Sequence, residues 1–275
     1  MRDRDITLQI NLSPGDVAYA AITVPALIRQ HPQVHKVLLV VDTCKPGKTK
    51  LVDPEVRFPE PSFSNRVQQI IDIATAIQEQ TPNCELYILR PDDPLIKKLG
   101  DLYLGGWYYH THDYGGCANM SYWAAFELPK TRYVLHFDGD MLLYQKPGYS
   151  WLDEAITLLE QNPSAVAATP RYNTPFEGAA ERPSFRHGVP YVAANNCWLD
   201  TFFSTRCLLV DKTRLHAHLP LMRGRILWET LAVKFFNRGY PRSPEIVMFR
   251  SIGGRGGHRS VSYTHLRAHE TGRNL

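Results

Sequence analysis

The sequence has few cysteines, no long apolar run and no block of basic residues. Its cysteines are odd in number, widely spaced and without a CxxC pair: Cys44, Cys84, Cys117, Cys197 and Cys207. This pattern argues against a disulfide framework or a zinc cage and favours a reducing compartment. Since no apolar run approaches the roughly 18 residues needed to cross a bilayer, we expect no transmembrane segment.

The charge of the chain is also modest. The formal net charge is +4, and the lysines and arginines form no long run. A dedicated nucleic-acid binder is therefore not expected. The first residues lead directly into an alternating segment and lack the longer apolar core of a secretory signal. We therefore expect a cytoplasmic protein.

Strand-like and helical segments alternate along the chain. Its 275 residues, 44% of them apolar and 21% charged, suit one large globular domain. The strand-like segments are residues 6–12, 37–41, 85–89, 133–138, 165–169 and 207–211, and the helical ones are 16–30, 65–77, 115–129, 150–159 and 228–238. This order predicts an α/β fold with a mostly parallel central sheet flanked by helices. We expect Pro25 to kink or split the first helix and Asn65 to cap the second.

Two aspartates at the end of one apolar run carry most of the functional information. Asp138 and Asp140 are separated by Gly139 and flanked on both sides by apolar residues. An ionised carboxylate in an apolar setting has to be paired, protonated or bound to a metal. Ligands of open α/β sheets bind outside the carboxyl ends of the strands. We therefore predict that both side chains enter a cleft and hold a divalent cation, Mn²⁺ or Mg²⁺, together with a diphosphate.

The acidic motif is one of six stretches that carry a family resemblance. They are residues 6–30, 37–42, 115–119, 136–140, 203–211 and 228–240. In this order they resemble the nucleotide-sugar glycosyltransferases of the GT-A fold, most closely glycosyltransferase family 2. The resemblance implies a single Rossmann-like domain over residues 1–260, with a nucleotide-binding half up to about residue 145 and an acceptor half after it. It also implies transfer of a sugar from a nucleotide diphosphate sugar to a hydroxyl of a glycan, lipid or small molecule.

The resemblance also assigns binding roles to single residues. The implied donor-binding residues are Leu12, Ser13, Asp42, Gly115, Asn119 and Asp138, with Asp42 on the nucleobase. The implied metal ligands are Asp138, Asp140 and His258. Simple capping of a turn or helix is an alternative explanation for Asp42 and Asn119.

The catalytic assignment implied by the resemblance falls on Glu229. An acid at this place in the family is the general base that deprotonates the acceptor hydroxyl. The family usually has Glu-Asp here and often Gln-x-x-Arg-Trp later, whereas this chain has Trp228-Glu229 and lacks the second motif. A carboxylate stabilised by the positive end of a helix explains Glu229 without catalysis. Asp200 is the second candidate for contact with the acceptor.

Three other interpretations stay open. His110, His112 and Asp113 could bind zinc or iron in a metal-dependent hydrolase. A sugar-phosphate nucleotidyltransferase shares a similar sheet, but its usual basic loop after the first strand is replaced here by residues 13–16, which contain no lysine or arginine. A non-catalytic module that binds nucleotide sugars or glycans would keep the same fold.

The last residues differ from the rest of the chain. Residues 261–275 lack the periodicity seen elsewhere. We predict that they are a non-native read-through segment that lies outside the fold.

Overall fold

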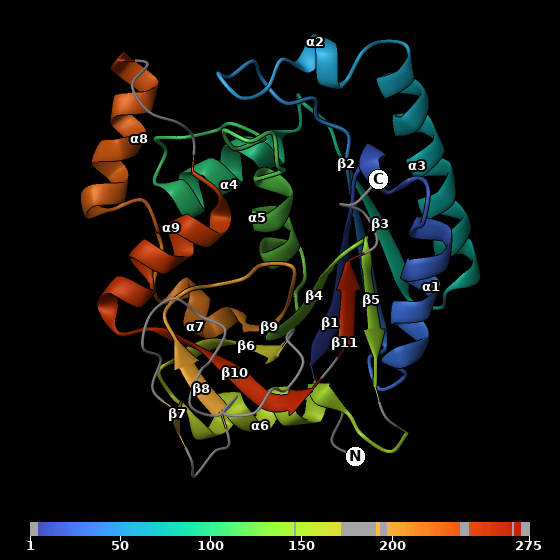
Figure 1. The fold of residues 1–275 in the computed structure, drawn as a ribbon, viewed down its shortest axis with the longest axis vertical. Coiled ribbons are helices and arrows are strands. Elements are labelled where there is room, and N and C mark those ends of the chain that lie inside the picture. The colour runs from blue at the N-terminus through green and yellow to red at the C-terminus, as the bar shows by residue number, and fades with distance from the viewer. Residues whose placement is uncertain are drawn as a thin grey trace.

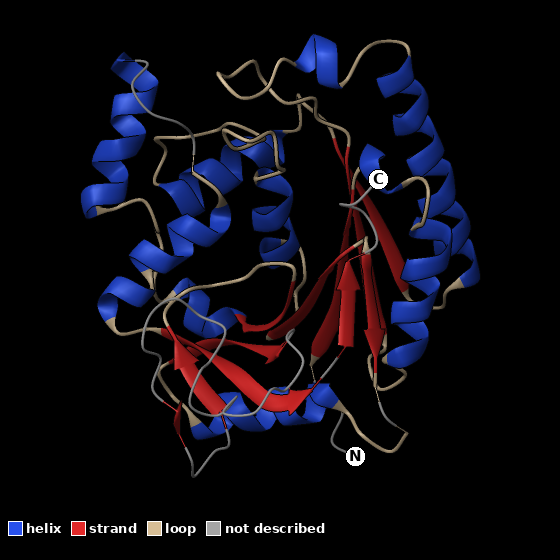
Figure 2. Cartoon of the chain, viewed as in Figure 1, coloured by secondary structure: helices blue, strands red, loops and turns tan. Residues whose placement is uncertain are grey.

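A computed structural model describes residues 5–145, 147–171, 191–192, 197–236, 242–265 and 267–270. Its centre is a nine-stranded sheet with helices on both faces (Figures 1 and 2). In sheet order the strands are β3 (Cys84–Leu89), β2 (Lys36–Asp42), β1 (Ile6–Leu12), β4 (Tyr133–Asp138), β9 (Cys207–Asp211), β6 (Ala165–Arg171), β10 (His258–His265), β8 (Cys197–Asp200) and β7 (Tyr191–Val192). Only β9 and β8 run against the other strands of this sheet, so the predicted α/β fold with a mostly parallel sheet is confirmed.

A second, two-stranded sheet lies beside the first. It pairs β5 (Met141–Tyr144) with β11 (Arg267–Glu270) in antiparallel register. Strand β10 continues to His265 between β6 and β8. Residues 261–265, which we expected outside the fold, therefore complete a central strand, and Val261 is fully buried in it.

Among the described residues, the five predicted helices are present but begin at other residues than predicted, and four further helices were not predicted. In chain order the helices are α1 (Ala20–Gln30), α2 (Pro54–Arg57), α3 (Ser62–Gln80), α4 (Pro94–Leu104), α5 (Met120–Glu127), α6 (Trp151–Gln161), α7 (Lys212–His216), α8 (Gly224–Phe236) and α9 (Pro244–Ser251). Those not predicted are α2, α4, α7 and α9. Helix α1 runs through Pro25 without being split, and α3 begins at Ser62, so Asn65 lies in its first turn rather than at its cap. No described helix has the length and apolar character of a membrane span.

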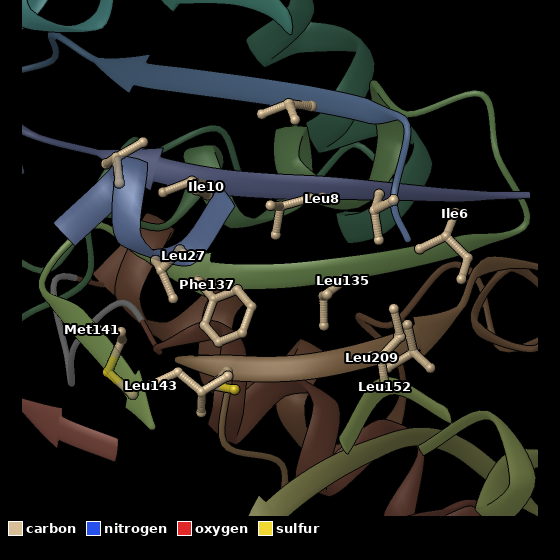
Figure 3. Close-up of a cluster of buried hydrophobic side chains, with 14 of the residues drawn as sticks. Ile6, Leu8, Ile10, Leu27, Leu135, Phe137, Met141, Leu143, Leu152 and Leu209 are labelled. Carbon is tan, nitrogen blue, oxygen red and sulfur yellow. The ribbon is translucent and has the colours of Figure 1, made fainter. Parts of the chain in front are cut away.

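The parallel strands separate two hydrophobic cores. Successive side chains of a strand point to opposite faces of the sheet. In β2, Leu39 and Val41 therefore pack with α1 and α3, whereas Leu38 and Val40 pack with α4 and α5. Figure 3 shows the first core, in which Leu27 of α1 lies near Phe137 of β4. Burial on both faces explains the continuous apolar run of β2 in the sequence.

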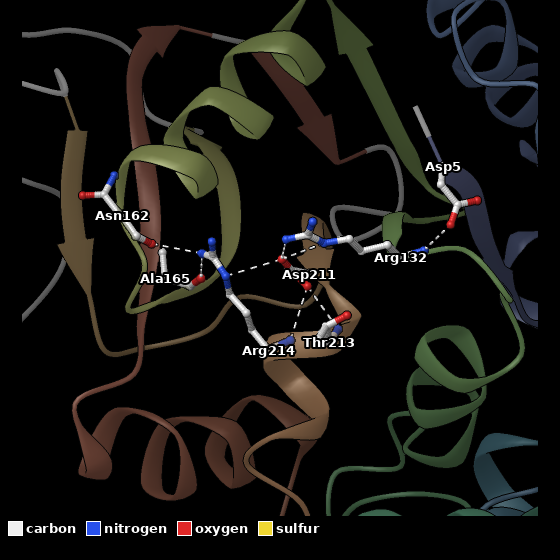
Figure 4. Close-up of polar contacts among 7 residues, drawn as sticks. All are labelled: Asp5, Arg132, Asn162, Ala165, Asp211, Thr213 and Arg214. Carbon is white, nitrogen blue, oxygen red and sulfur yellow. Dashed lines mark hydrogen bonds and ion pairs between the residues drawn. The ribbon is translucent and has the colours of Figure 1, made fainter. Parts of the chain in front are cut away.

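A buried carboxylate fixes the end of β9. Asp211 is fully buried and accepts hydrogen bonds from the N–H groups of Thr213 and Arg214, so it caps α7. Its Oδ2 lies 2.8 Å from Nη2 of Arg132 and 3.4 Å from Nε of Arg214 (Figure 4). A buried charge with several partners of this kind is costly to disturb.

Candidate functional site

The site is set by the carboxyl ends of three neighbouring parallel strands. Strand β1 lies between β2 and β4, with Leu12 opposite Val41 and Asn11 opposite Asp138. The residues that end these strands therefore meet at one edge of the sheet, where open α/β folds bind ligands. This register brings Asp42 and Asp138 to the same edge as the loop after β1.

Two adjoining cavities open at this edge. The larger has a volume of about 640 Å³ and the smaller about 160 Å³. Their walls share six residues: Ser13, Asp16, Asp42, Cys117, Ala118 and Asp140. Leu12 and Asp138 line the smaller cavity only. The structure therefore brings together five of the predicted site residues around one hollow.

The acidic motif forms a tight turn against β1. A Cβ atom on Gly139 would lie 2.5 Å from Cδ2 of Leu12 and 2.9 Å from the carbonyl oxygen of Asn11. No side chain fits in that space. The Gly139 carbonyl also accepts a hydrogen bond of 2.5 Å from Oγ1 of Thr23 in α1. Glycine thus lets the β4 tip approach β1 closely enough for both aspartates to reach the cavity wall.

Buried polar groups hold Asp138 from behind. The hydroxyl of Tyr122 lies 2.8 and 2.9 Å from its two oxygens. The imidazole Nε2 of His136 lies 3.4 Å from Oδ1, and Nδ1 of the same ring hydrogen-bonds Oε1 of Gln9. Gln9 in turn donates to Oδ1 of Asn11 at 2.9 Å. Because Gln9 and His136 are fully buried, this series of hydrogen bonds gives the side chain of Asp138 a defined orientation.

Asp16 is a site residue that the sequence interpretation missed. It accepts hydrogen bonds from the backbone N–H and the hydroxyl of Ser13 at 2.6 and 2.9 Å, and from the hydroxyl of Tyr19 at 3.0 Å. Burial raises the pKa of Asp16 to about 6, and the negative charge of Asp140 adds to the rise. The signal was present, since a serine followed three residues later by an acid is the sequence pattern of a capping box.

Asp42 lies deep in the floor of the larger cavity. Only 2% of its surface is exposed, and Oδ1 accepts a hydrogen bond of 2.9 Å from the N–H of Cys44. Burial raises the pKa of Asp42, and the nearby His112 offsets this only in part. The Cys44 contact is the turn-capping role considered from the sequence, and the remaining oxygen has no hydrogen-bond partner among the described residues.

The predicted donor residues before α5 support the cavity from outside. Neither Gly115 nor Asn119 lines a cavity, whereas residues 116–118 between them do. The Gly115 carbonyl accepts a hydrogen bond of 2.9 Å from Arg57. Asn119 is buried at the start of α5 and its side chain makes no cap hydrogen bond.

Both predicted catalytic acids are bound by arginines. Glu229 in α8 pairs with Arg225 at 3.0 Å, Arg242 at 3.3 Å and Arg250. Burial alone would raise the pKa of Glu229, but these arginines lower it below its usual value. Asp200 is fully buried, with Oδ2 at 2.8 Å from Nη2 of the equally buried Arg259. Neither acid lines the two cavities.

His258 does not join the two aspartates. It begins β10 opposite Ala165, the first residue of β6, and its Nδ1 lies 3.3 Å from Oγ of Ser164. Because β6 and β4 both run antiparallel to β9, this is the opposite edge of the sheet from Asp138. The structure thus separates the predicted histidine ligand from the predicted carboxylate ligands.

A second acid that the sequence interpretation missed lies in the C-terminal half, near the acidic motif. Glu245, in the first turn of α9, accepts a hydrogen bond of 3.1 Å from the N–H of Thr205. The next residue, Arg206, accepts a backbone hydrogen bond from Asp138. Burial raises the pKa of Glu245, Arg206 lowers it, and the charge of Asp138 raises it again. Glu245 is therefore electrostatically coupled to the acidic motif.

The protein contributes few ligands to any metal at this site. Within the described residues, no group of three or more His, Cys, Asp or Glu side chains is arranged to hold a metal ion. This also leaves the alternative site at His110 and His112 without a ligand set. His112 instead lines the larger cavity together with Asp42.

Comparison with known proteins identifies the fold. No protein-family model matches the chain, and no curated protein matches it by sequence. The solved structure of GalNAc-T7 with UDP, GalNAc and Mn²⁺ is similar over 96% of this chain, with a TM-score of 0.51 and 8% identity. The chain has a GT-A fold. It spans 43% of the length of GalNAc-T7.

Two further solved structures show weaker similarity. The galactosyltransferase LgtC, in complex with donor and acceptor sugar analogues, matches 94% of this chain and 73% of its own, with 10% identity and a TM-score of 0.42. A UTP-bound UGPase from Acinetobacter baumannii matches 98% of this chain and 89% of its own, with 12% identity and a TM-score of 0.43. The similarity to GalNAc-T7 confirms, at the level of the fold, the GT-A resemblance inferred from the sequence.

Proposed function

We propose that the protein is a metal-dependent glycosyltransferase, most similar to glycosyltransferase family 2, that uses a nucleotide diphosphate sugar. One observation carries the proposal. Asp138 and Asp140 lie at the tip of β4 on the wall of a hollow that continues to Asp42 and Ser13. The structure with the same fold, GalNAc-T7, contains UDP, GalNAc and Mn²⁺.

The donor set of the site suits Mn²⁺ or Mg²⁺ that is shared with a substrate. Asp138 and Asp140 offer hard oxygen ligands, and the described residues provide no third ligand for a closed cage. Mg²⁺ is typically held by one or two carboxylates plus substrate phosphates. When bound there, the cation would neutralise negative charge on a departing nucleoside diphosphate.

The other end of the hollow suits the nucleoside. The carboxyl of Asp42 can accept a hydrogen bond from a base N–H, and Leu12 and Ser13 border the same space. Arg57 stacks on Phe58 at 5.4 Å on the opposite wall. Gly115 and Asn119 would act indirectly, by holding residues 116–118 against the cavity.

The base that activates the acceptor hydroxyl is a separate proposal. A general base needs hydrogen-bond reach and a suitable pKa. The arginine contacts of Glu229 and Asp200 disfavour this role. Glu245 is the third acid to test, because its contact with the N–H of Thr205 adjoins the backbone hydrogen bond between Asp138 and Arg206. Substituting each acid with its amide and measuring transfer and donor hydrolysis separately would identify the base.

A thermal-shift panel of UDP- and GDP-sugars, with and without Mn²⁺, tests the proposed activity. Ligands that bind only the folded state raise its stability by mass action. We expect a shift that requires both nucleotide and metal, and release of nucleoside diphosphate on turnover. Asp140→Asn should abolish both. Release of pyrophosphate from a nucleoside triphosphate would instead indicate a nucleotidyltransferase, and binding without turnover a non-catalytic module.

A further inference from the structure

Helix α8 is apolar on more sides than its contacts within the protein require. Its inner side carries Ile226 and Thr230, which are buried against the core. Its outer side carries large apolar residues whose surfaces are mostly exposed: Trp228 at 72%, Phe235 at 62% and Phe236 at 70%. Large apolar side chains gathered on one exposed surface often mark a site of interaction with another protein or with a membrane.

The exposed aromatics form one continuous stripe. Residues three, four and seven apart lie on the same face of a helix. Trp228 and Phe235 are seven residues apart. Ala232 lies between them in the stripe, four residues after Trp228 and four before Phe236. The other exposed large apolar residues of the described chain are spread over different elements, such as Ile22 in α1 and Leu51 before α2. Figure 1 shows α8 at the upper left, on the outside of the molecule.

Positive charge accompanies this stripe. Arg225 lies three residues before Trp228, on the same face, and its side chain is 83% exposed. Arg225, Arg242 and Arg250 surround the single carboxylate of Glu229, which leaves an excess of two positive charges in the cluster. Arg223, just before the helix, is also exposed. The surface thus combines aromatic side chains with an excess of guanidinium groups over carboxylates.

We propose that the outer face of α8 docks on a membrane surface that contains anionic lipids. Interfacial helices combine Trp, Phe and Leu on one face with Lys and Arg beside it, and lie in the headgroup plane. Anionic headgroups attract adjacent basic residues, and tryptophan is favoured at the level of the headgroups. At 13 residues, α8 is too short to span a bilayer but long enough to lie on one.

A second copy of the chain fits this face less well. In a two-fold dimer the same patch lies on both subunits, so each copy would bring the same excess of positive charge to the interface. That excess would have no negative counterpart in the partner's copy of the patch. An anionic lipid surface complements the same cluster.

Co-sedimentation with vesicles of phosphatidylcholine, with and without phosphatidylglycerol, tests the proposal. The full chain, without donor or metal, should bind the vesicles that contain phosphatidylglycerol and bind phosphatidylcholine alone much more weakly. The double variant Trp228→Ala/Phe236→Ala should bind at least about ten-fold more weakly, because two large apolar side chains no longer enter the interface. Trp228→Phe should retain most of the binding. Arg225→Gln should bind less and depend less on salt.

The matched control is the double variant Ile22→Ala/Leu51→Ala. It removes two apolar side chains that are 69% and 62% exposed but lie away from α8. It should bind like the unmodified chain, as should Asp140→Asn, so that lipid binding and sugar transfer can fail separately. Absence of binding to phosphatidylglycerol vesicles, equal losses in both double variants, or a dimer abolished by Trp228→Ala/Phe236→Ala would each overturn the proposal.

Discussion

Two pairs of carboxylates in this molecule are held in opposite ways. In the N-terminal half, Asp16 and Asp42 accept hydrogen bonds from hydroxyl and backbone N–H groups, and no described lysine or arginine forms an ion pair with either. In the C-terminal half, Asp200 and Glu229 are in ion pairs with arginines. Burial raises the pKa of the first pair, whereas arginines lower that of Glu229.

This difference separates acids that can bind a ligand from acids that hold the fold. A carboxylate that is desolvated without a cation gains free energy when a ligand supplies a cation or a donor. A carboxylate already paired with arginine has no such gain to make. The contrast can be tested by removing one acid at a time from each half.

The largest effect on stability is expected for Asp200→Asn. It would leave the fully buried Arg259 without its 2.8 Å partner, and breaking a buried pair from one side typically costs about 3–5 kcal/mol. Urea unfolding measures the change. The control is Asp101→Asn, which breaks an exposed pair with Lys97 and should change the free energy of unfolding by less than about 1 kcal/mol. Equal losses in the two variants would contradict the assignment of Asp200 to the fold.

The next largest effect is expected for Tyr122→Phe, and it should appear in the activity of the protein. It removes the hydroxyl that lies 2.8 and 2.9 Å from the oxygens of Asp138, and a hydrogen bond to a charged group contributes about 1.5–3 kcal/mol. We expect turnover to fall by about ten-fold or more and the Mn²⁺ concentration for half-maximal rate to rise.

The matched control for this variant is Tyr103→Phe. Tyr103 is also buried and donates to a carboxylate, that of Glu127 at 3.3 Å, but it lies outside both cavities. It should alter stability without altering the metal requirement. If both variants change the Mn²⁺ dependence alike, Tyr122 has no special role at Asp138.

A smaller, pH-dependent effect is expected for Asp16→Asn. The folded-state pKa of Asp16 is about 6, above the ordinary 3.8, so the folded protein binds this proton more tightly than the unfolded chain. The contribution of Asp16 to stability therefore falls as pH rises from about 4 to 6. In metal-free buffer, Asp16→Asn should be more stable than the unmodified chain at pH 7, and this gain should disappear near pH 4.

Asp53→Asn should change the stability at pH 7 in the opposite direction. The pKa of Asp53 is lowered by its hydrogen bond with Lys48, so its contribution to stability is present at neutral pH and lost on acidification. Its substitution should therefore destabilise the protein at pH 7. If both variants lose stability at pH 7, burial of the ionised Asp16 carboxylate does not destabilise the folded protein.

The smallest effect on stability is expected for Glu229→Gln. Its ion pairs involve half-buried or exposed arginines, and such pairs typically contribute less than about 1 kcal/mol. Urea unfolding at pH 7 should show a loss of that size, which disappears at acidic pH where the carboxylate is protonated. A loss of sugar transfer by two orders of magnitude, with donor hydrolysis retained, would instead restore Glu229 as the catalytic base.

Local sequence patterns were enough to predict the strands β1, β2, β3, β4, β6 and β9 and the tip of β4, but not the remaining strands. The runs at residues 6–12 and 37–41 are buried on both faces of the sheet, and their apolar character follows from that position alone. The Asp138-Gly139-Asp140 motif sits where a polar break in an apolar run predicts a strand end. The helix starts were less accurate, because Ser62 and Met120 begin their helices without a side-chain cap.

Long-range pairing could not be read from the sequence. Glu229 pairs with Arg250, and Asp200 with Arg259, only because α9 and β10 return to those positions in the folded chain. His258 lies away from the acidic motif because it begins β10, whereas Asp138 ends β4, and the two strands run in the same direction. The hydrogen bonds of Asp16 were predictable from its spacing to Ser13, but its raised pKa also depends on the charge of Asp140, which is distant in the sequence.

The close contact at Gly139 has a mechanical consequence. A methyl group there would collide with Leu12 and the Asn11 carbonyl, so even alanine would force the turn away from the end of β1. Because Asp138 and Asp140 flank this glycine, that displacement would carry both carboxylates away from the loop at Ser13. In this way one missing side chain sets how close the two ends of the hollow lie.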